Sequence, residues 1–128
     1  LEIRIVIQEQ SNDVTFPGVA SSHNNLGLVE RQQGNLDLAK DYHERSLVFW
    51  RAAHSARHPS IARALRNLGL VLLAMEDRVS ARKCFAETLN IRTHSFGAEH
   101  ADLLRSQQDI QLVDQGLAPK DVGDVIFH

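Results

Sequence analysis

The sequence has few of the features that mark an exported, membrane-bound or disulfide-stabilised protein. Its single cysteine, Cys84, has no second cysteine with which to form an internal disulfide, so nothing indicates an oxidising compartment. No apolar run approaches the length that spans a bilayer. The opening residues carry charges at Glu2, Arg4 and Glu9, which the apolar stretch of a signal peptide lacks. We therefore expect a cytoplasmic location and no membrane partner.

Aromatic residues and net charge are also scarce. Aromatic side chains make up 5% of the 128 residues, and the formal net charge is −2. A charge this small does not attract nucleic acid by bulk electrostatics, and an apolar set dominated by leucine and alanine favours helices over sheets. The sequence contains no His-Glu-x-x-His string, no Gly-x-Ser-x-Gly string and no glycine-rich phosphate loop. We expect an all-α protein with no enzymatic activity, no cofactor and no nucleic-acid partner.

The strongest positive feature is an internal repeat. Residues 17–29 align without a gap on residues 59–71, which lie 42 residues further along, and the string Asn-Leu-Gly-Leu-Val occurs whole in both. A third, decayed copy follows from residue 100. Stepping backwards by the same spacing places residues 5–7 on residues 47–49. We infer that the chain opens with the second helix of a preceding repeat and is a piece of a longer protein.

Each repeat is predicted to contain two helices. Pro17 and Pro59 stand where a helix can start, and Gly34-Asn35 and Glu76-Asp77 break the helical pattern near the middle of each repeat. We expect helices at residues 1–11, 17–33, 36–54, 59–75, 78–95 and 100–115. The single repeat domain divides into a preceding helix and loop (1–16), repeat one (17–58), repeat two (59–100), the first helix of a degenerate third repeat (101–116) and a C-terminal tail (117–128). The tail either forms a short helix from Pro119 or stays loose.

Several short strings resemble the long-repeat tetratricopeptide units of kinesin light chains. These strings are Leu89-Asn90-Ile91-Arg92 before the loop at residues 96–100, His58-Pro59, Asn24-Asn25-Leu26-Gly27 and Arg66-Asn67-Leu68-Gly69. The resemblance covers nearly everything before Leu117. It implies a right-handed α-solenoid of antiparallel helix pairs that binds other proteins.

The chain keeps some of the packing positions of that family and departs at others. The small residue that lets the two helices of a repeat approach is kept as Ala39 and Ala81, and the aromatic position that follows holds His43 and Phe85. The third repeat has Gln111 where the glycine should stand. Because a side chain there obstructs close helix contact, we expect the third repeat to be a terminal cap or to sit slightly displaced.

The resemblance implies that the first helix of each pair lines a concave groove that contacts ligand. The residues carried over to this surface are Ser21, Asn24, Asn25, Leu28 and Arg31 in repeat one, Arg63, Arg66, Asn67, Leu70 and Leu73 in repeat two, and Arg105, Gln108, Asp109 and Leu112 in the third. The candidate peptide-binding set is Asn24, Asn25, Leu28, Arg31, Arg63, Arg66, Asn67, Leu70, Arg105 and Gln108.

The chemistry of these side chains suggests what the groove would bind. Asparagine amides can pair with a peptide backbone as donor and as acceptor, and arginine forks bind carboxylates at two points. With Leu28, Leu70 and Leu112 as an apolar floor, they predict an extended or short helical peptide that carries acidic residues. The alternative is that the arginines simply form a solvated face.

The histidines and the arginine-rich stretch have ordinary structural explanations. His54 and His58 are four residues apart, but Pro59 follows at once, so they straddle a helix end instead of sharing one face. We expect no metal site. Cys84 is expected to be a small buried residue. Residues 51–66 are rich in arginine but lack the interleaved aromatics of an RNA-binding segment.

The sequence therefore predicts a non-enzymatic scaffold or adaptor segment whose groove binds a partner protein or peptide. Two alternatives stay open. The fragment could be the structural arm of a larger multidomain signalling protein, with its groove against another part of its own chain. It could also self-associate into a homo-oligomer through apolar repeat ends, with the first helix docked in place or swapped between chains.

Overall fold

The structure, a computed structural model, describes residues 17–95, 100–120, 123, 124 and 126. Within these residues the chain forms helices and no strand, which confirms the all-α class. The helices are α2 (Pro17–Gln32), α3 (Leu36–Ala53), α4 (Pro59–Ala74), α5 (Arg78–His94) and α6 (His100–Asp114). Each ends one residue before the position expected from the sequence. The helix expected at 1–11 lies outside the described residues.

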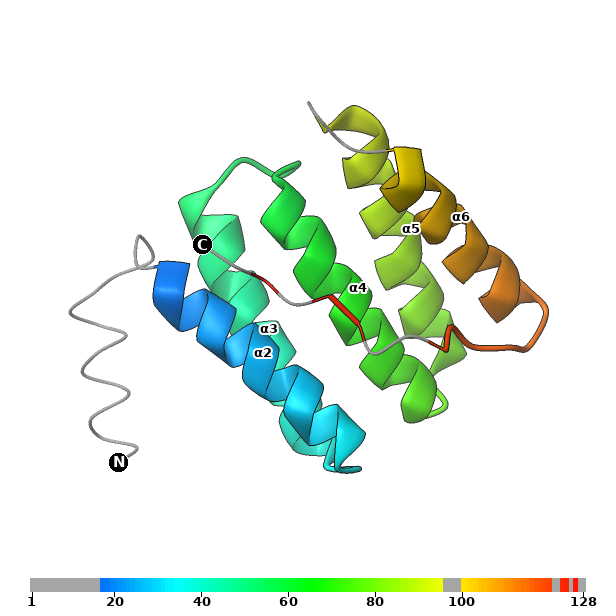
Figure 1. The fold of residues 1–128 in the computed structure, drawn as a ribbon, viewed down its shortest axis with the longest axis horizontal. Coiled ribbons are helices and arrows are strands. Elements are labelled where there is room, and N and C mark those ends of the chain that lie inside the picture. Colours follow the sequence, from blue (N-terminus) through cyan, green and yellow to red (C-terminus); the bar gives the residue numbers. More distant parts are fainter. Residues whose placement is uncertain (1–16, 96–99, 121–122, 125, 127–128) are drawn as a thin grey trace.

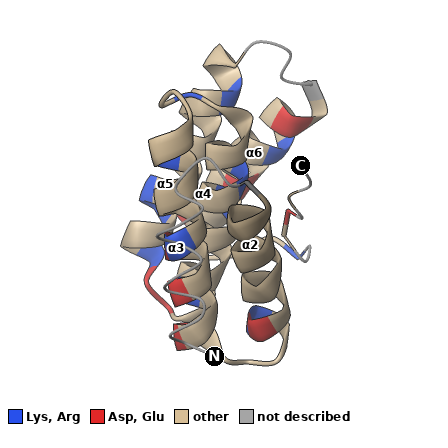
Figure 2. Cartoon of the chain, turned by 90° about the vertical axis from the view of Figure 1, so that its left-hand side faces the viewer, with Lys and Arg blue, Asp and Glu red and all other residues tan. Residues whose placement is uncertain are grey.

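The helices form antiparallel pairs in two layers. Helix α2 packs against α3 and α4 against α5, while α3 with α4 and α5 with α6 join successive pairs. Figure 2 shows α3 and α5 on one side of the molecule and α2 and α6 on the other, with Lys and Arg distributed over several helices. Helix α4 lies between neighbours, and nearly all of its residues from Ser60 to Leu72 are buried. Its high content of Leu, Ala and Val fits this position.

The first helices all end in the same way, which turns the chain sharply into the next element. The residue in the left-handed conformation is Gly34 after α2 (φ 85°), Glu76 after α4 (φ 66°) and Gly116 after α6 (φ 78°). At each of these positions the backbone N–H bonds three residues back, and the next N–H bonds five residues back. This is the pairing of a Schellman motif, which satisfies the last carbonyl groups of a helix.

The second helix of each pair packs closely on the first because a glycine faces a ring. A methyl group added at Gly27 would stand 2.7 Å from the His43 ring, and one added at Gly69 would stand 2.7 Å from the Phe85 ring. A polar contact at equivalent positions accompanies each: Ser46 Oγ donates to the carbonyl of Ala20, and Thr88 Oγ1 lies 3.4 Å from that of Ala62 while donating to the carbonyl of Cys84 at 2.8 Å. The second set of contacts lies 42 residues after the first.

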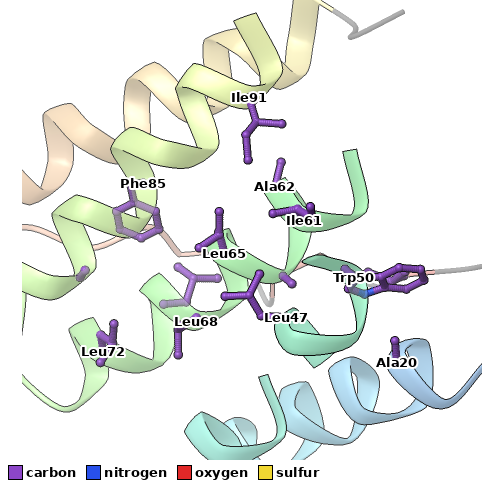
Figure 3. Packing of buried hydrophobic residues seen from close by; sticks show 14 of the residues in the cluster. Ala20, Leu47, Trp50, Ile61, Ala62, Leu65, Leu68, Leu72, Phe85 and Ile91 are labelled. Carbon is purple, nitrogen blue, oxygen red and sulfur yellow. The ribbon is translucent and has the colours of Figure 1, made fainter. Parts of the chain in front are cut away.

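Between the pairs, apolar side chains form one continuous cluster. Figure 3 shows Leu47 and Trp50 of α3 beside Ile61 and Leu65 of α4, with Phe85 of α5 on the far side of α4. Trp50 is 3% exposed and packs in this cluster. Burial of apolar surface stabilises a fold by about 25 cal/mol per Å², so this cluster holds successive helix pairs together.

After α6 the chain turns back across the first helices. Arg78 of α5 fixes the turn, because its guanidinium donates to the carbonyls of Gly116 (2.8 Å) and Leu117 (3.1 Å). The described residues of the tail, 117–120, 123, 124 and 126, are not helical. In Figure 1 this stretch, orange to red, leaves α6 and crosses α4 toward α2. We call Gly123, Asp124 and Ile126 the return segment.

Candidate functional site

The first helices, α2, α4 and α6, present one surface to the return segment. We call this surface the asparagine face. It consists of Asn24, Asn25, Leu28, Arg66, Asn67, Leu70 and Arg105. All seven residues belong to the peptide-binding set predicted from the sequence, and the structure brings them together around Gly123, Asp124 and Ile126.

Two asparagines pair with the backbone of the return segment as both donor and acceptor. Asn67 Nδ2 donates to the carbonyl of Asp124 (2.5 Å), and Asn67 Oδ1 accepts from the N–H of Asp124 (2.6 Å). Asn25 does the same for Ile126, at 3.3 Å and 3.2 Å. Asn24 Nδ2 adds a second donor to the Asp124 carbonyl, at 3.0 Å. These asparagine amides bond only backbone groups, so their hydrogen bonds do not depend on the side chains of the bound segment.

The carboxylate of Asp124 lies among three arginines from three helices. Arg66 Nη1 and Arg105 Nη1 donate to its Oδ1, at 3.4 and 3.0 Å, and Arg92 Nη2 donates to its Oδ2, at 2.8 Å. Arg66 also bonds the carboxylate of Asp109, which accepts its Nε (2.6 Å) and Nη2 (3.1 Å). One carboxylate of the return segment therefore accepts from three guanidinium groups.

Gly123 lies directly on the apolar floor. A methyl group at this glycine would stand 2.7 Å from Leu28 Cδ2, 2.8 Å from Asn67 Oδ1 and 3.3 Å from Leu70 Cδ1. Its φ of 95° is also a conformation that side chains oppose. Leu28 and Leu70 are 6% and 3% exposed, so two of the three leucines predicted as an apolar floor are covered here, whereas Leu112 is half-buried on α6.

The other three residues of the predicted set lie in different surroundings. Arg31 is near enough to His43 for its charge to lower the pKa of that imidazole, and Arg63 acts in the same way on His58. Gln108 is exposed on α6. The alternative of a solvated arginine face is wrong for Arg66, whose side chain is fully buried in its ion pair with Asp109.

Sequence reasoning missed Arg92 and the return segment. Arg92 belongs to a second helix, α5, which the family resemblance did not assign to the groove, and its Nη1 also donates to Ser106 Oγ (2.9 Å). Arginines on α5 are expected to be exposed to solvent, so the sequence did not indicate that Arg92 is buried. The string Gly-Asp-Val-Ile was visible in the tail, but nothing local indicated that it returns across α4.

The histidine and cysteine positions serve the fold. His58 Nδ1 accepts the N–H of Ser60 (3.1 Å) and so caps α4. The His54 and His58 rings stack with centroids 3.7 Å apart. Burial raises the pKa of the half-buried Cys84 thiol to about 11, so the thiolate is scarce at neutral pH. In the described part of the chain, no group of three or more His, Cys, Asp or Glu residues is placed to hold a metal ion.

A comparison of the sequence with known protein families matches residues 18–94 to the tetratricopeptide repeat. The matched stretch runs from the first turn of α2 to the last residue of α5. It includes both glycine-to-ring contacts and the asparagines that hold the return segment. Across the residues that the structure describes, none of the helices has the length and apolar character needed to cross a membrane.

Proposed function

Because the chain belongs to the tetratricopeptide repeat family, whose repeats generally mediate interactions between proteins, we propose that it is a non-enzymatic binding module. Its asparagine face takes up an extended segment of a partner protein, and that segment carries an acidic residue. The kinship to the long repeats of kinesin light chains is part of the proposal. It is supported by the recurrence of the glycine-to-ring contacts 42 residues apart.

The observation that carries the proposal is the pairing of Asn67 and Asn25 with backbone groups. An amide side chain that both donates to and accepts from one residue satisfies an extended chain in the way that a neighbouring β-strand does. Asn24 and Asn67 are 0% exposed, and buried polar groups of this kind require partners. A face with this chemistry favours a peptide backbone over any small molecule.

The arginines favour an acidic side chain beside that backbone. Arg66, Arg92 and Arg105 converge on one carboxylate position from α4, α5 and α6. A carboxylate shared by several guanidinium groups makes charge-assisted hydrogen bonds, which are roughly twice as strong as neutral ones. An apolar or basic residue at this position would remove a negative charge from between three guanidinium groups.

A second candidate function is a structural arm, in which the face holds only its own chain. The contacts of Asp124 and Ile126 favour this reading. The two candidates differ in whether the face accepts a segment supplied from another molecule, and that difference can be measured.

The test is a peptide array probed with the 128-residue chain. The array carries extended acidic peptides together with the same peptides in which each acid is replaced by its amide. Asn67→Ala removes two backbone contacts and is expected to weaken capture at least ten-fold. Asn90→Ala makes the same chemical change on the exposed surface of α5 and serves as the matched control.

Arg105 is the arginine to reverse in this test. Its side chain is 38% exposed, so Arg105→Glu changes the charge facing the ligand at the outer edge of the cluster. A change at Arg66 would instead remove the partner of Asp109 in an ion pair that is buried on both sides. Arg105→Glu is expected to weaken capture of the acidic peptides more than capture of their amide versions. Capture that survives both Asn67→Ala and Arg105→Glu would contradict the proposal.

A further inference from the structure

We propose that the asparagine face recognises the sequence Gly-Asp-x-aliphatic, and that the return segment is an internal copy of this ligand that a partner has to displace. This inference rests on the proposed function and names the ligand for it. It also assigns a direction: the bound chain runs from α4 toward α2, opposite to the order of the repeats.

The register is set by the spacing of the two asparagines. Asn25 and Asn67 occupy equivalent positions, 42 residues apart, in α2 and α4. They pair with Ile126 and Asp124, which are two residues apart. Two residues of extended chain span about 6.6 Å, and their backbone groups point the same way. Adjacent repeats therefore match every second residue of an extended ligand.

The glycine position is set by contact with the floor. The chain at Gly123 approaches Leu28, Leu70 and Asn67 so closely that a Cβ would overlap two of them. The positive φ excludes most other residues independently. A ligand with any other residue before the aspartate would have to rise off the floor, which would break the pairing of Asn67 with the next residue.

The aspartate position is set by two constraints at once. Asn67 fixes the backbone of Asp124, while the three arginines fix the carboxylate, with Arg66 and Arg105 at one oxygen and Arg92 at the other. Glutamate places its carboxylate one methylene further from the same backbone position. We therefore expect aspartate to be preferred over glutamate.

The aliphatic position follows from burial. The side chain of Ile126 is 1% exposed and belongs to the same apolar cluster as the core between the helix pairs. Its neighbour two residues earlier points its carboxylate into the arginine cluster. Gly123, Asp124 and Ile126 thus each meet a different chemical demand on the same face, as residues of a specific ligand do.

Because the return segment belongs to the same chain, it competes strongly with an external peptide for the asparagine face. A segment joined by a short linker acts at an effective concentration of about 1 mM. An external peptide whose intrinsic Kd is about 10 μM would then bind the intact chain about 100-fold more weakly. Loss of the internal contacts should restore the intrinsic affinity.

The experiment measures binding of a fluorescein-labelled peptide with the sequence of residues 119–128 to the 128-residue chain by fluorescence anisotropy. Asp124→Lys in the chain places a cation against three arginines and so releases the return segment while leaving the asparagine face unchanged. We expect the peptide to bind this variant at least ten-fold more tightly than it binds the wild-type chain. Gly123→Ala releases the segment by steric overlap instead, keeps all charges, and should give the same result.

Peptide variants test the sequence rule on the released chain. Replacing the glycine by alanine, the aspartate by lysine or the isoleucine by serine should each weaken binding at least ten-fold, as should reversing the sequence. Adding Asn67→Ala to the chain should abolish binding. Circular dichroism confirms that each chain variant is helical. If neither Asp124→Lys nor Gly123→Ala folds, the segment is an integral part of the fold and the inference is wrong.

The remaining outcomes separate this inference from the proposed function. Equal peptide affinity for wild type and both released variants would overturn the internal competition and leave the groove assignment standing. If the released variants bind acidic array peptides through Asn67 but ignore the 119–128 peptide, the sequence rule is wrong and the proposed function survives. If no peptide binds in a way that depends on Asn67, both the inference and the proposed function are wrong.

Discussion

Gly69 of α4 lies under the ring of Phe85 of α5, so close that an added methyl group would stand 2.7 Å from Cε1 of the ring. This contact sets how near the two helices of the second pair approach. Gly27 and His43 make the same contact in the first pair. The spacing of the layers, and with it the shape of the asparagine face, depends on these two glycines.

Gly69→Ala should therefore destabilise the chain. Overpacking of a core costs about 1–3 kcal/mol, and the better helix propensity of alanine offsets about 1 kcal/mol of this. We expect a net loss of about 1–2 kcal/mol in the free energy of unfolding, measured by urea denaturation. In a Phe85→Leu background the same substitution should cost less, because the smaller side chain leaves room. An equal cost in both backgrounds would show that the ring is not the obstacle.

His43 should make stability depend on pH. Burial, together with the charge of Arg31, lowers the pKa of His43 from 6.5 to about 4. Between these two pH values the imidazole is protonated in the unfolded chain and neutral in the folded chain. The free energy of unfolding is therefore highest above pH 6.5 and decreases as the pH falls from 6.5 toward 4. The full loss corresponds to about 3 kcal/mol.

His43→Phe reproduces the residue of the second pair and tests this assignment. We expect a flatter profile of unfolding free energy between pH 6.5 and 4, and higher stability at the acid end. His94→Phe, at an exposed position on α5, is the matched control and should retain the wild-type profile. A profile unchanged by His43→Phe would place the pH dependence elsewhere.

Glu76 follows α4 in a backbone conformation that glycine adopts after α2 and α6. Its φ of 66° lies in the left-handed region, as do those of Gly34 and Gly116. A side chain there costs about 1 kcal/mol, so Glu76→Gly should raise the thermal midpoint by a few degrees. Glu76→Ala keeps the Cβ and should give no such gain. A higher midpoint for the alanine variant alone would point to the lost charge instead of the backbone.

The sequence was sufficient for the helices and for the main part of the asparagine face. Helix starts at Pro17 and Pro59 and breaks at Gly34 and Glu76 are local signals, because each reflects the conformational preference of one residue. The repeat then placed Asn25 and Asn67 on the same surface. Those predictions needed no knowledge of how the third repeat or the tail packs.

The return segment and Arg92 lay beyond such reasoning for a physical reason. The contact of Asn25 with Ile126 joins residues that are 101 positions apart, and the tail reaches it after a turn at Gly116 and Leu117 whose carbonyls accept from Arg78. The burial of Arg92 depends on Asp124 reaching it from the tail. Contacts of this kind are set by the assembled helices and not by any local pattern. The division of the chain into repeats stays a prediction.

Hydrogen exchange at the backbone amides of Asp124 and Ile126 tests the central claim most directly, because each N–H donates to an asparagine of the face. The account predicts slow exchange at both amides in the wild-type chain. Asn67→Ala should speed exchange at Asp124 by about ten-fold, the loss expected for about 1.4 kcal/mol of protection, and Asn90→Ala should leave it unchanged. Exchange at both wild-type amides as fast as in an unstructured peptide would contradict the account.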